Sequence, residues 1–406
     1  MKMPTSFRPS FFDFLSVTQP ERIHNQMLIW LLSPECEAFT HSQKILVFNR
    51  LSGLNAAADN DITFIKQYDQ SWRSFVNQDI VMRVGENVCV LDNRLRHPLH
   101  TDRLNDYKAA LESSSDKAVL HTASFLTAQH YSFCYLTVCE NPPIGEGWRV
   151  VRYAELLALL QSLSTAALPQ HPHTIIVAEY LHTLAQFVSA VHLFLTEPEC
   201  RREAILLADE LYQNGEHDRY GALAPMRIPL RSAADYCVAQ SFFPFLTKAA
   251  WFDVWSGLQA EYDTVQMLAL QFGEFEPSYL HLICGTLSLL DQVGAEEHEF
   301  QCIIRFDNAQ LYVGISPPFA VSADAWWIPE SIYDWFDERV ERFGYESVKR
   351  PPEYSAFLAM VCDMKVEIGV QHSLLELPLD ALRNIIRKEI SCAKTVFAEL
   401  LLVEGL

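Results

Sequence analysis

The sequence lacks the motifs by which the commonest kinds of site are found. Its ten cysteines form no Cys-x-x-Cys pair, which excludes a zinc ribbon and a thioredoxin-type motif. The closest approach to a metal-ligand spacing is His130, Cys134 and Cys139, and we interpret these thiols as buried and free. There is no Gly-x-x-x-x-Gly-Lys-Ser/Thr loop, no Gly-x-Ser-x-Gly turn and no His-Glu-x-x-His motif.

Long apolar runs and targeting signals are also missing. Residues 1–10 carry positive charge but no apolar segment and no small-residue cleavage site, so they do not predict a signal peptide. No uninterrupted apolar run reaches the roughly 18 residues that span a membrane. We therefore expect a cytoplasmic protein that does not associate with a membrane.

Positive charge is scarce in the second part of the chain. Residues 1–165 carry 15 Lys and Arg against 17 Asp and Glu, a balance of −2, whereas residues 166–406 carry 16 against 34, a balance of −18. An acidic surface repels polyphosphate at long range. Any contact with DNA is therefore expected in the N-terminal part, and the acidic C-terminal part is expected to meet a protein partner or a second copy of the chain.

The 406 residues, half of them apolar, are enough for two or three domains with substantial cores. The polar segment 169–174 (PQHPHT) contains two prolines and lies where the charge balance changes, so it predicts a boundary between residues 1–168 and 169–406. We expect the C-terminal region to be mainly helical, with a late β-hairpin at 300–315. The helices predicted there span 175–195, 198–213, 232–238, 251–272, 279–290, 332–343, 352–364 and 378–402.

The central feature of the N-terminal part is a predicted hairpin. Asp79 opens an apolar strand (DIVMRV), a turn follows at 85–87, and a second apolar strand (VCVLDNRL) ends in Asp92-Asn93-Arg94. Strand alternation can place an acidic residue from each strand on the same side of the sheet, which suits a divalent cation. A predicted helix at 102–111 leads to a strand at 131–138, and this crossover implies a parallel pairing. The fold class is therefore α/β, a small mixed sheet flanked by helices.

An Asp on one strand, followed about a dozen positions later by an acidic residue, a spacer and a basic residue, resembles the core signature of the PD-(D/E)XK nuclease superfamily. The segment 21–34 (ERIHNQMLIWLLSP) is similar to the helix that opens one bacterial branch of that superfamily. The other segments that resemble elements of this branch, in chain order, are Leu104–Tyr107, Phe133–Thr137, Trp148–Leu157, Ile175–Phe187, Ile303–Arg305 and Leu311–Ile315.

The resemblance implies a restriction-endonuclease-like core and metal-dependent cleavage of DNA, in a bacterial defence context. Glu21, Asp79 and Asp92 would hold Mg²⁺ or Mn²⁺, and one metal-bound water would be the nucleophile. Arg94 stands where the branch has a lysine; its guanidinium stays protonated and cannot act as a base. The basic or titratable residues just after the site, which would contact phosphates or form a solvated face, are Arg96, His97, His100, Arg103 and Lys108.

Each of these residues has a structural interpretation as well. Asp79 suits a strand edge, Asp92 suits an Asx-turn, and Glu21 follows Pro20 where a carboxylate favours the helix dipole. Arg94 could stabilise a phosphate, or it could hold Asp79 and Asp92 in an ion-pair network without metal. Two hypotheses follow: a magnesium-dependent nuclease, and an inactive pseudo-nuclease that serves as a protein- or nucleic-acid-binding module.

Two further features have open interpretations. His24 lies three residues after Glu21 and thus near the same helix face, where it would either support the metal site or pack between helices. The pair Trp326-Trp327 would either anchor a partner or form a buried helix entry.

Overall fold

The computed structural model divides the chain into two compact units. Unit 1 comprises residues 1–195 and 207–249, and unit 2 comprises residues 196–206 and 250–406. The residues that the structure describes are 7, 12, 20–64, 80–94, 130–138, 147–164, 171–213, 230–239, 243–262, 266–267, 279–290, 297–307, 310–316, 346–347, 358–363 and 373–402. Each unit contains one β-sheet with helices packed against it.

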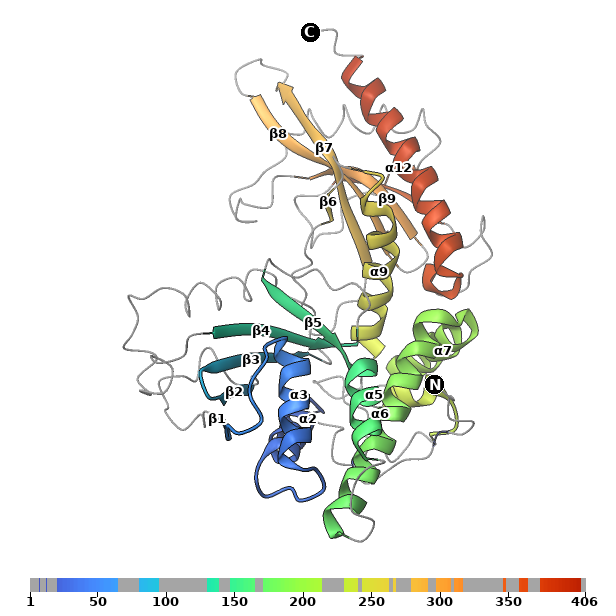
Figure 1. The fold of residues 1–406 in the computed structure, drawn as a ribbon. Helices are drawn as coiled ribbons and strands as arrows, with labels where there is room; N and C mark the ends of the chain where they lie inside the picture. Colours follow the sequence, from blue (N-terminus) through green and yellow to red (C-terminus); the bar gives the residue numbers. More distant parts are fainter. Residues whose placement is uncertain are drawn as a thin grey trace. The chain divides into compact units, whose positions relative to one another are not determined.

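The sheet of unit 1 is mixed and has five strands in the order β1-β2-β3-β4-β5. The strands are β1 (Ile62–Phe64), β2 (Ile80–Val84), β3 (Asn87–Arg94), β4 (His130–Thr137) and β5 (Trp148–Arg152). The first three strands form an antiparallel meander, whereas β4 runs parallel to β3 and β5 parallel to β4. The predicted mixed α/β architecture is therefore confirmed (Figure 1).

The turn between β2 and β3 depends on a glycine. Gly85 has a φ of 59°, in the left-handed region that residues with a Cβ rarely adopt. A Cβ built there would lie 3.1 Å from the side chain of Asn60. The predicted hairpin and its turn are confirmed, and β3 is buried at every position from Val88 to Asn93.

Four helices pack around this sheet. They are α2 (Pro20–Leu32), α3 (His41–Ser52), α5 (Tyr153–Ser164) and α6 (Pro172–Thr196). The ends of α3 follow from its sequence, because Thr40 forms a capping box with Gln43 and Gly53 ends the helix at a φ of 70°. Phe48, at 0 % exposure, lies on the buried face of α3, and the helix contacts β3 and β4.

Helix α6 is long and apolar enough, by length and composition, to cross a membrane. However, 61 % of its most apolar window is buried inside the molecule, as in a core helix of a soluble protein. Tyr180 and Phe187 are among its fully buried side chains. Unit 1 includes α6, which follows the boundary predicted at residue 168. Tyr180 and Phe187 of this helix contact His24 of α2, and Phe187 also contacts Tyr153 of α5.

Two helices contribute to both units. Helix α7 (Pro198–Gln213) begins in unit 2 and ends in unit 1, and α9 (Phe243–Gln259) begins in unit 1 and ends in unit 2. The short helix α8 (Ala233–Ala239) lies in unit 1, where the Cys237 thiol donates to the carbonyl of Ala190 at 3.7 Å.

The sheet of unit 2 is antiparallel and has six strands in the order β10-β11-β9-β8-β7-β6. The strands are β6 (Gln266–Met267), β7 (Tyr279–Leu290), β8 (Glu297–Asp307), β9 (Gln310–Ser316), β10 (Glu346–Ser347) and β11 (Leu358–Asp363). The predicted hairpin at 300–315 is confirmed as β8 and β9.

Three predicted helices of this region are wrong in whole or in part. The predicted helix 251–272 ends at Gln259 as α9, and strand β6 lies within the rest of its range. Residues 279–290 form strand β7, and the end of the predicted helix 352–364 forms strand β11. Both segments are short apolar runs whose helical or extended state is decided by pairing partners far along the chain: β7 pairs with β8, and β11 with β9. The described residues of the C-terminal region thus combine several helices with a six-stranded sheet, of which the sequence predicted only the hairpin at 300–315.

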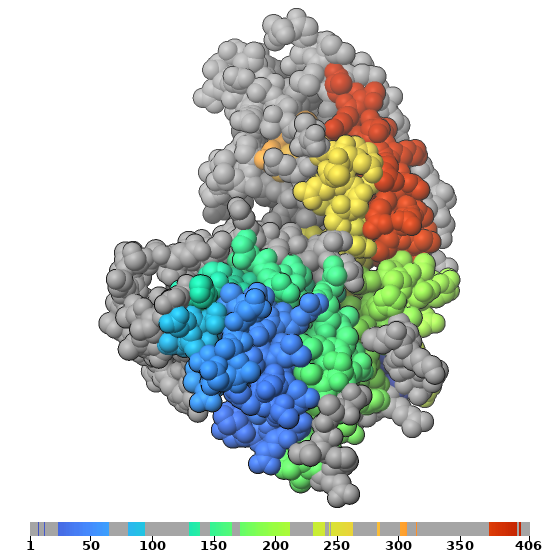
Figure 2. All heavy atoms as spheres, viewed as in Figure 1, coloured from blue at the N-terminus to red at the C-terminus, as the bar shows by residue number. Residues whose placement is uncertain are grey.

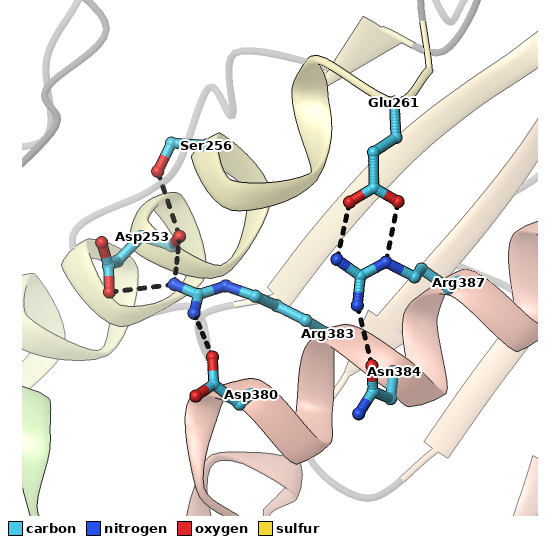
Figure 3. A network of polar contacts seen from close by, with 7 residues as sticks. All are labelled: Asp253, Ser256, Glu261, Asp380, Arg383, Asn384 and Arg387. Carbon is cyan, nitrogen blue, oxygen red and sulfur yellow. Dashed lines mark hydrogen bonds and ion pairs between the residues drawn. The ribbon is translucent and has the colours of Figure 1, made fainter.

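The last helix, α12 (Leu379–Leu402), covers this second sheet. Its buried residues Leu382, Ile386, Ile390 and Ala393 recur at helical spacing, and it contacts β7 and β8. Helices α9 and α12 lie side by side, as the yellow and red surfaces of Figure 2 show. The polar contacts between them are drawn in Figure 3.

The chain just before α12 is held by a buried arginine. Arg201 of α7 is 0 % exposed, and its guanidinium donates to the carbonyls of Leu375 and Leu377, both at 2.7 Å. These carbonyls belong to the 3₁₀ helix η6 (Leu374–Glu376) and to the residue that caps it. Burial lowers the pKa of Arg201 to about 10, so it stays charged at neutral pH.

Candidate functional site

The structure describes only part of the predicted metal site. Asp92 lies in β3 and is 3 % exposed. Glu21 is the second residue of α2 and Arg94 the last of β3, but the side chains of both lie outside the described part. The predicted residues that fall entirely outside the described ranges are Asp79, Arg96, His97, His100, Arg103, Lys108, Trp326 and Trp327.

The register of β2 and β3 relates the two hairpin aspartates. Ile80 of β2 pairs with Leu91 of β3, in a ladder that continues to Val84 and Asn87. Asp79 immediately precedes Ile80 in the sequence, and Asp92 immediately follows Leu91. Each aspartate is therefore the sequence neighbour of one member of the Ile80–Leu91 pair, which is the pair furthest from the Gly85 turn.

Next to Asp92, a buried amide joins three elements of unit 1. Asn93 is 0 % exposed; its Oδ1 accepts a hydrogen bond from the Tyr153 hydroxyl at 2.7 Å, and its Nδ2 donates to Asn25 Oδ1 at 2.8 Å. Tyr153 is the first residue of α5, and Asn25 lies in α2. Both groups of the Asn93 amide are thus used, one towards each helix.

The aromatic side chains beside this amide enclose a histidine. His24 Nδ1 lies 3.1 Å from the Tyr180 hydroxyl, and the His24 ring is 5.6 Å from that of Tyr153 in an edge-on contact and 6.0 Å from that of Phe187. Burial lowers the pKa of His24 to about 4 and raises that of Tyr180. His24 is therefore neutral at physiological pH and packed between helices.

Strand alternation separates Asp92 from this cluster. Adjacent residues of a strand point to opposite faces, so Asp92 and Asn93 take different sides of the sheet. Asn93 faces α2, whereas Asp92 pairs laterally with Tyr135 of β4. Asn25 of α2 accordingly contacts the face opposite to that of Asp92. Glu21 lies about one helical turn before Asn25, and its side chain is outside the described residues. Of the three predicted carboxylates, the structure describes only the side chain of Asp92. The register of β2 and β3 ends at the pair Ile80 and Leu91, which are the sequence neighbours of Asp79 and Asp92.

The cluster brings together residues from four segments that the sequence analysis treated separately. Asn25 and His24 come from the opening helix, Asn93 is the spacer of the Asp-x-Arg triplet, and Tyr153 comes from the WRVVRY segment. Tyr180 and Phe187, from the following helix, complete it. The sequence did not reveal that these residues touch. The available signal was the presence of polar residues inside otherwise apolar segments.

The donor set is chemically compatible with a hard divalent cation. Magnesium binds carboxylate oxygens and keeps several waters, so two aspartates with one further carboxylate would suffice. Among the side chains that the structure describes, no group of three or more His, Cys, Asp or Glu residues could hold a metal ion. The side chains of Asp79 and Glu21 do not belong to that set.

Comparisons with protein-family models, with curated proteins and with solved structures found no match to this chain.

Proposed function

We propose that the chain is a PD-(D/E)XK nuclease-like protein whose site lies where β2 begins and β3 ends. The register supports this proposal, because Ile80 pairs with Leu91 and the next residues in the sequence, away from the Gly85 turn, are Asp79 and Asp92. The antiparallel meander, followed by a parallel fourth strand and flanked by helices, also supports a restriction-endonuclease-like core.

In this proposal Asp79 and Asp92 hold Mg²⁺ or Mn²⁺, with Glu21 as a third ligand. The bound metal would activate a water for in-line attack on a phosphodiester. Arg94 keeps its positive charge and neutralises the phosphate as negative charge develops in the transition state, but it does not take a proton from the water.

DNA is the proposed substrate, bound by unit 1 in the cytoplasm, and defence against foreign DNA is the proposed context. The near balance of charge over residues 1–165 supports this choice, because the strong excess of acid falls in the rest of the chain. The acidic residues of the C-terminal part are proposed to face a protein partner or a second copy.

A plasmid-nicking assay tests the reaction. We expect the full chain to nick supercoiled plasmid with Mg²⁺ or Mn²⁺, and Asp79→Ala and Asp92→Ala each to abolish nicking. Glu86→Ala is the matched control, because Glu86 is an exposed acid in the turn of the same hairpin. The nicking rate of Glu21→Ala measures how much the proposed third ligand contributes to the reaction. Nicking that survives both aspartate changes would overturn the proposed site.

The second candidate function is a binding module without catalysis, and Arg94 is the observation that favours it. A protonated guanidinium beside two aspartates can replace the metal in an ion-pair network. Arg94→Lys separates the two functions. If the parent is inert and Arg94→Lys nicks plasmid, the rest of the site is functional and the arginine alone prevents cleavage. If both are inert, the binding module is favoured.

A further inference from the structure

The buried amide of Asn93 lies between the two residues of β3 that the proposed site requires. Asp92 precedes it and Arg94 follows it, and the Asn93 side chain is fixed on both sides, by Tyr153 at 2.7 Å and by Asn25 at 2.8 Å. A strand end is usually the part of a strand that moves most easily, because its ladder ends there. The side-chain bonds add restraint at that position.

We infer that Asn93, held by Tyr153 and Asn25, is a positioning residue that fixes the end of β3 and thereby the direction in which Asp92 is presented. This inference rests on the proposed function and extends it. Because Asn93 and Asp92 occupy opposite faces of one strand, rotation of the backbone at Asn93 turns Asp92 with it. A metal ligand displaced by about 1 Å loses much of its contribution.

The geometry assigns a distinct part to each helix. Tyr153 is the first residue of α5 and directly follows β5, so the position of its hydroxyl depends on the position of β5. The position of the Asn25 side chain depends on that of α2. The Asn93 amide is too short to reach both if either helix shifts by more than the tolerance of a hydrogen bond. The three residues therefore couple the packing of two helices to the end of β3.

Unit 1 provides a matched pair of variants for the test. Tyr153 and Tyr180 are both buried, at 1 % and 0 % exposure, and the hydroxyl of each has a partner in the same cluster. The Tyr153 hydroxyl donates to Asn93, whereas that of Tyr180 pairs with His24 and not with β3. Tyr153→Phe and Tyr180→Phe therefore each remove one buried hydroxyl, but only Tyr153→Phe releases Asn93.

We expect Tyr153→Phe to lower the rate of plasmid nicking about tenfold or more and to raise the metal concentration needed for half-maximal rate, as loss of a residue supporting a metal ligand does. Tyr180→Phe should leave both quantities within about twofold of the parent, although the two variants melt at similar temperatures. Equal effects of the two changes on rate and on metal dependence would overturn the inference.

A second measurement tests the positioning role of Asn93 without relying on nuclease activity. Amide hydrogen exchange is followed in the full chain without metal, comparing residues 91–94 with the central residues of β4. Faster exchange at 91–94 in Tyr153→Phe alone supports the positioning role even if the parent never nicks DNA, in which case only the proposed reaction fails. Exchange that rises equally in both variants overturns the role whatever the activity.

Discussion

Arg387 of α12 donates two parallel hydrogen bonds to the carboxylate of Glu261, from Nε to Oε2 at 2.8 Å and from a terminal nitrogen to Oε1 at 2.6 Å (Figure 3). Glu261 lies two residues after the end of α9. The same guanidinium also donates to Asn384 Oδ1 at 2.7 Å. This side-on geometry is the strongest that an arginine and a carboxylate form, but the pair is exposed to solvent.

Glu261→Gln should therefore lower Tm only slightly, and only at low salt. The hydrogen bond from Arg387 lowers the pKa of Glu261 below its ordinary 4.5, so the stabilisation is present above that pH and is lost as pH falls through the lowered value. In 1 M NaCl, where the screening length is about 3 Å, parent and variant should melt together. Glu210→Gln, an exposed acid elsewhere, is the control; a difference that persists in high salt would contradict the expectation.

Gly257 of α9 leaves room for the neighbouring Arg383. A Cβ at this position would lie 2.7 Å from Arg383 Nε, and Arg383 bonds the Asp253 carbonyl at 2.9 Å and Asp380 at 2.6 Å. In an Arg383→Ala background, Gly257→Ala should stabilise the helix by about 1 kcal/mol through its higher helix propensity. In the parent the gain should be smaller or reversed. A double-mutant cycle by urea unfolding measures the difference, and simple additivity would contradict it.

The buried His24 should make stability depend on pH. Its pKa falls from 6.5 to about 4 on folding, so the unfolded chain binds more protons between these values. The free energy of unfolding should then decrease as pH falls from 6.5 towards 4, by about 3 kcal/mol in full. Urea unfolding across this range should show a shallower slope for His24→Gln. His130→Gln, at an exposed position, should keep the slope of the parent.

Arg201 should be the residue of α7 that is least tolerant of change. Arg201→Met keeps an unbranched apolar stem but leaves the carbonyls of Leu375 and Leu377 without their buried donor. We expect a loss of about 3 kcal/mol in the free energy of unfolding. Arg202→Met, at the exposed neighbouring position, should change it by less than about 0.5 kcal/mol. Similar values for the two variants would contradict the buried-anchor interpretation.

Metal should stabilise the folded chain if the proposed site operates. A ligand that binds only the native state raises Tm by mass action, and a free concentration 100 times Kd adds about 2.7 kcal/mol. Millimolar Mg²⁺ or Mn²⁺ should raise the Tm of the parent, whereas Asp92→Asn should abolish the shift and Glu86→Gln should retain it. A parent that shows no shift would count against an operating site.

The sequence correctly predicted those elements whose local pattern of apolar residues is compatible with only one type of secondary structure. The β2–β3 hairpin has two apolar strands around a Gly85 turn, and α12 has a clear apolar stripe; both are confirmed. Strand β7 was predicted as a helix because its apolar, leucine-containing run suits either state. Its extended form is set by pairing with β8, which includes a register shift between Ile283 and Gly285. Such pairing is not encoded in the run itself.

The candidate site shows the same limit. Sequence reasoning marked Asp92 and the segments around it, but it did not reveal that Asn93 bonds both Asn25 and Tyr153, residues 68 and 60 positions away. A side-chain hydrogen bond over that distance depends on how two helices settle against the sheet. The register that relates the neighbours of Asp79 and Asp92 is also visible only once the strands are paired.

The chain passes between its two units three times, at residues 195–196, 206–207 and 249–250, and the last two passages fall inside α7 and α9. Neither unit can therefore be obtained by truncating the gene at a single point. A fragment that stops at residue 168 or at 195 omits residues 207–249, which belong to the N-terminal unit, and should be recovered in inclusion bodies. A soluble half-molecule would need the missing segment supplied through a designed linker.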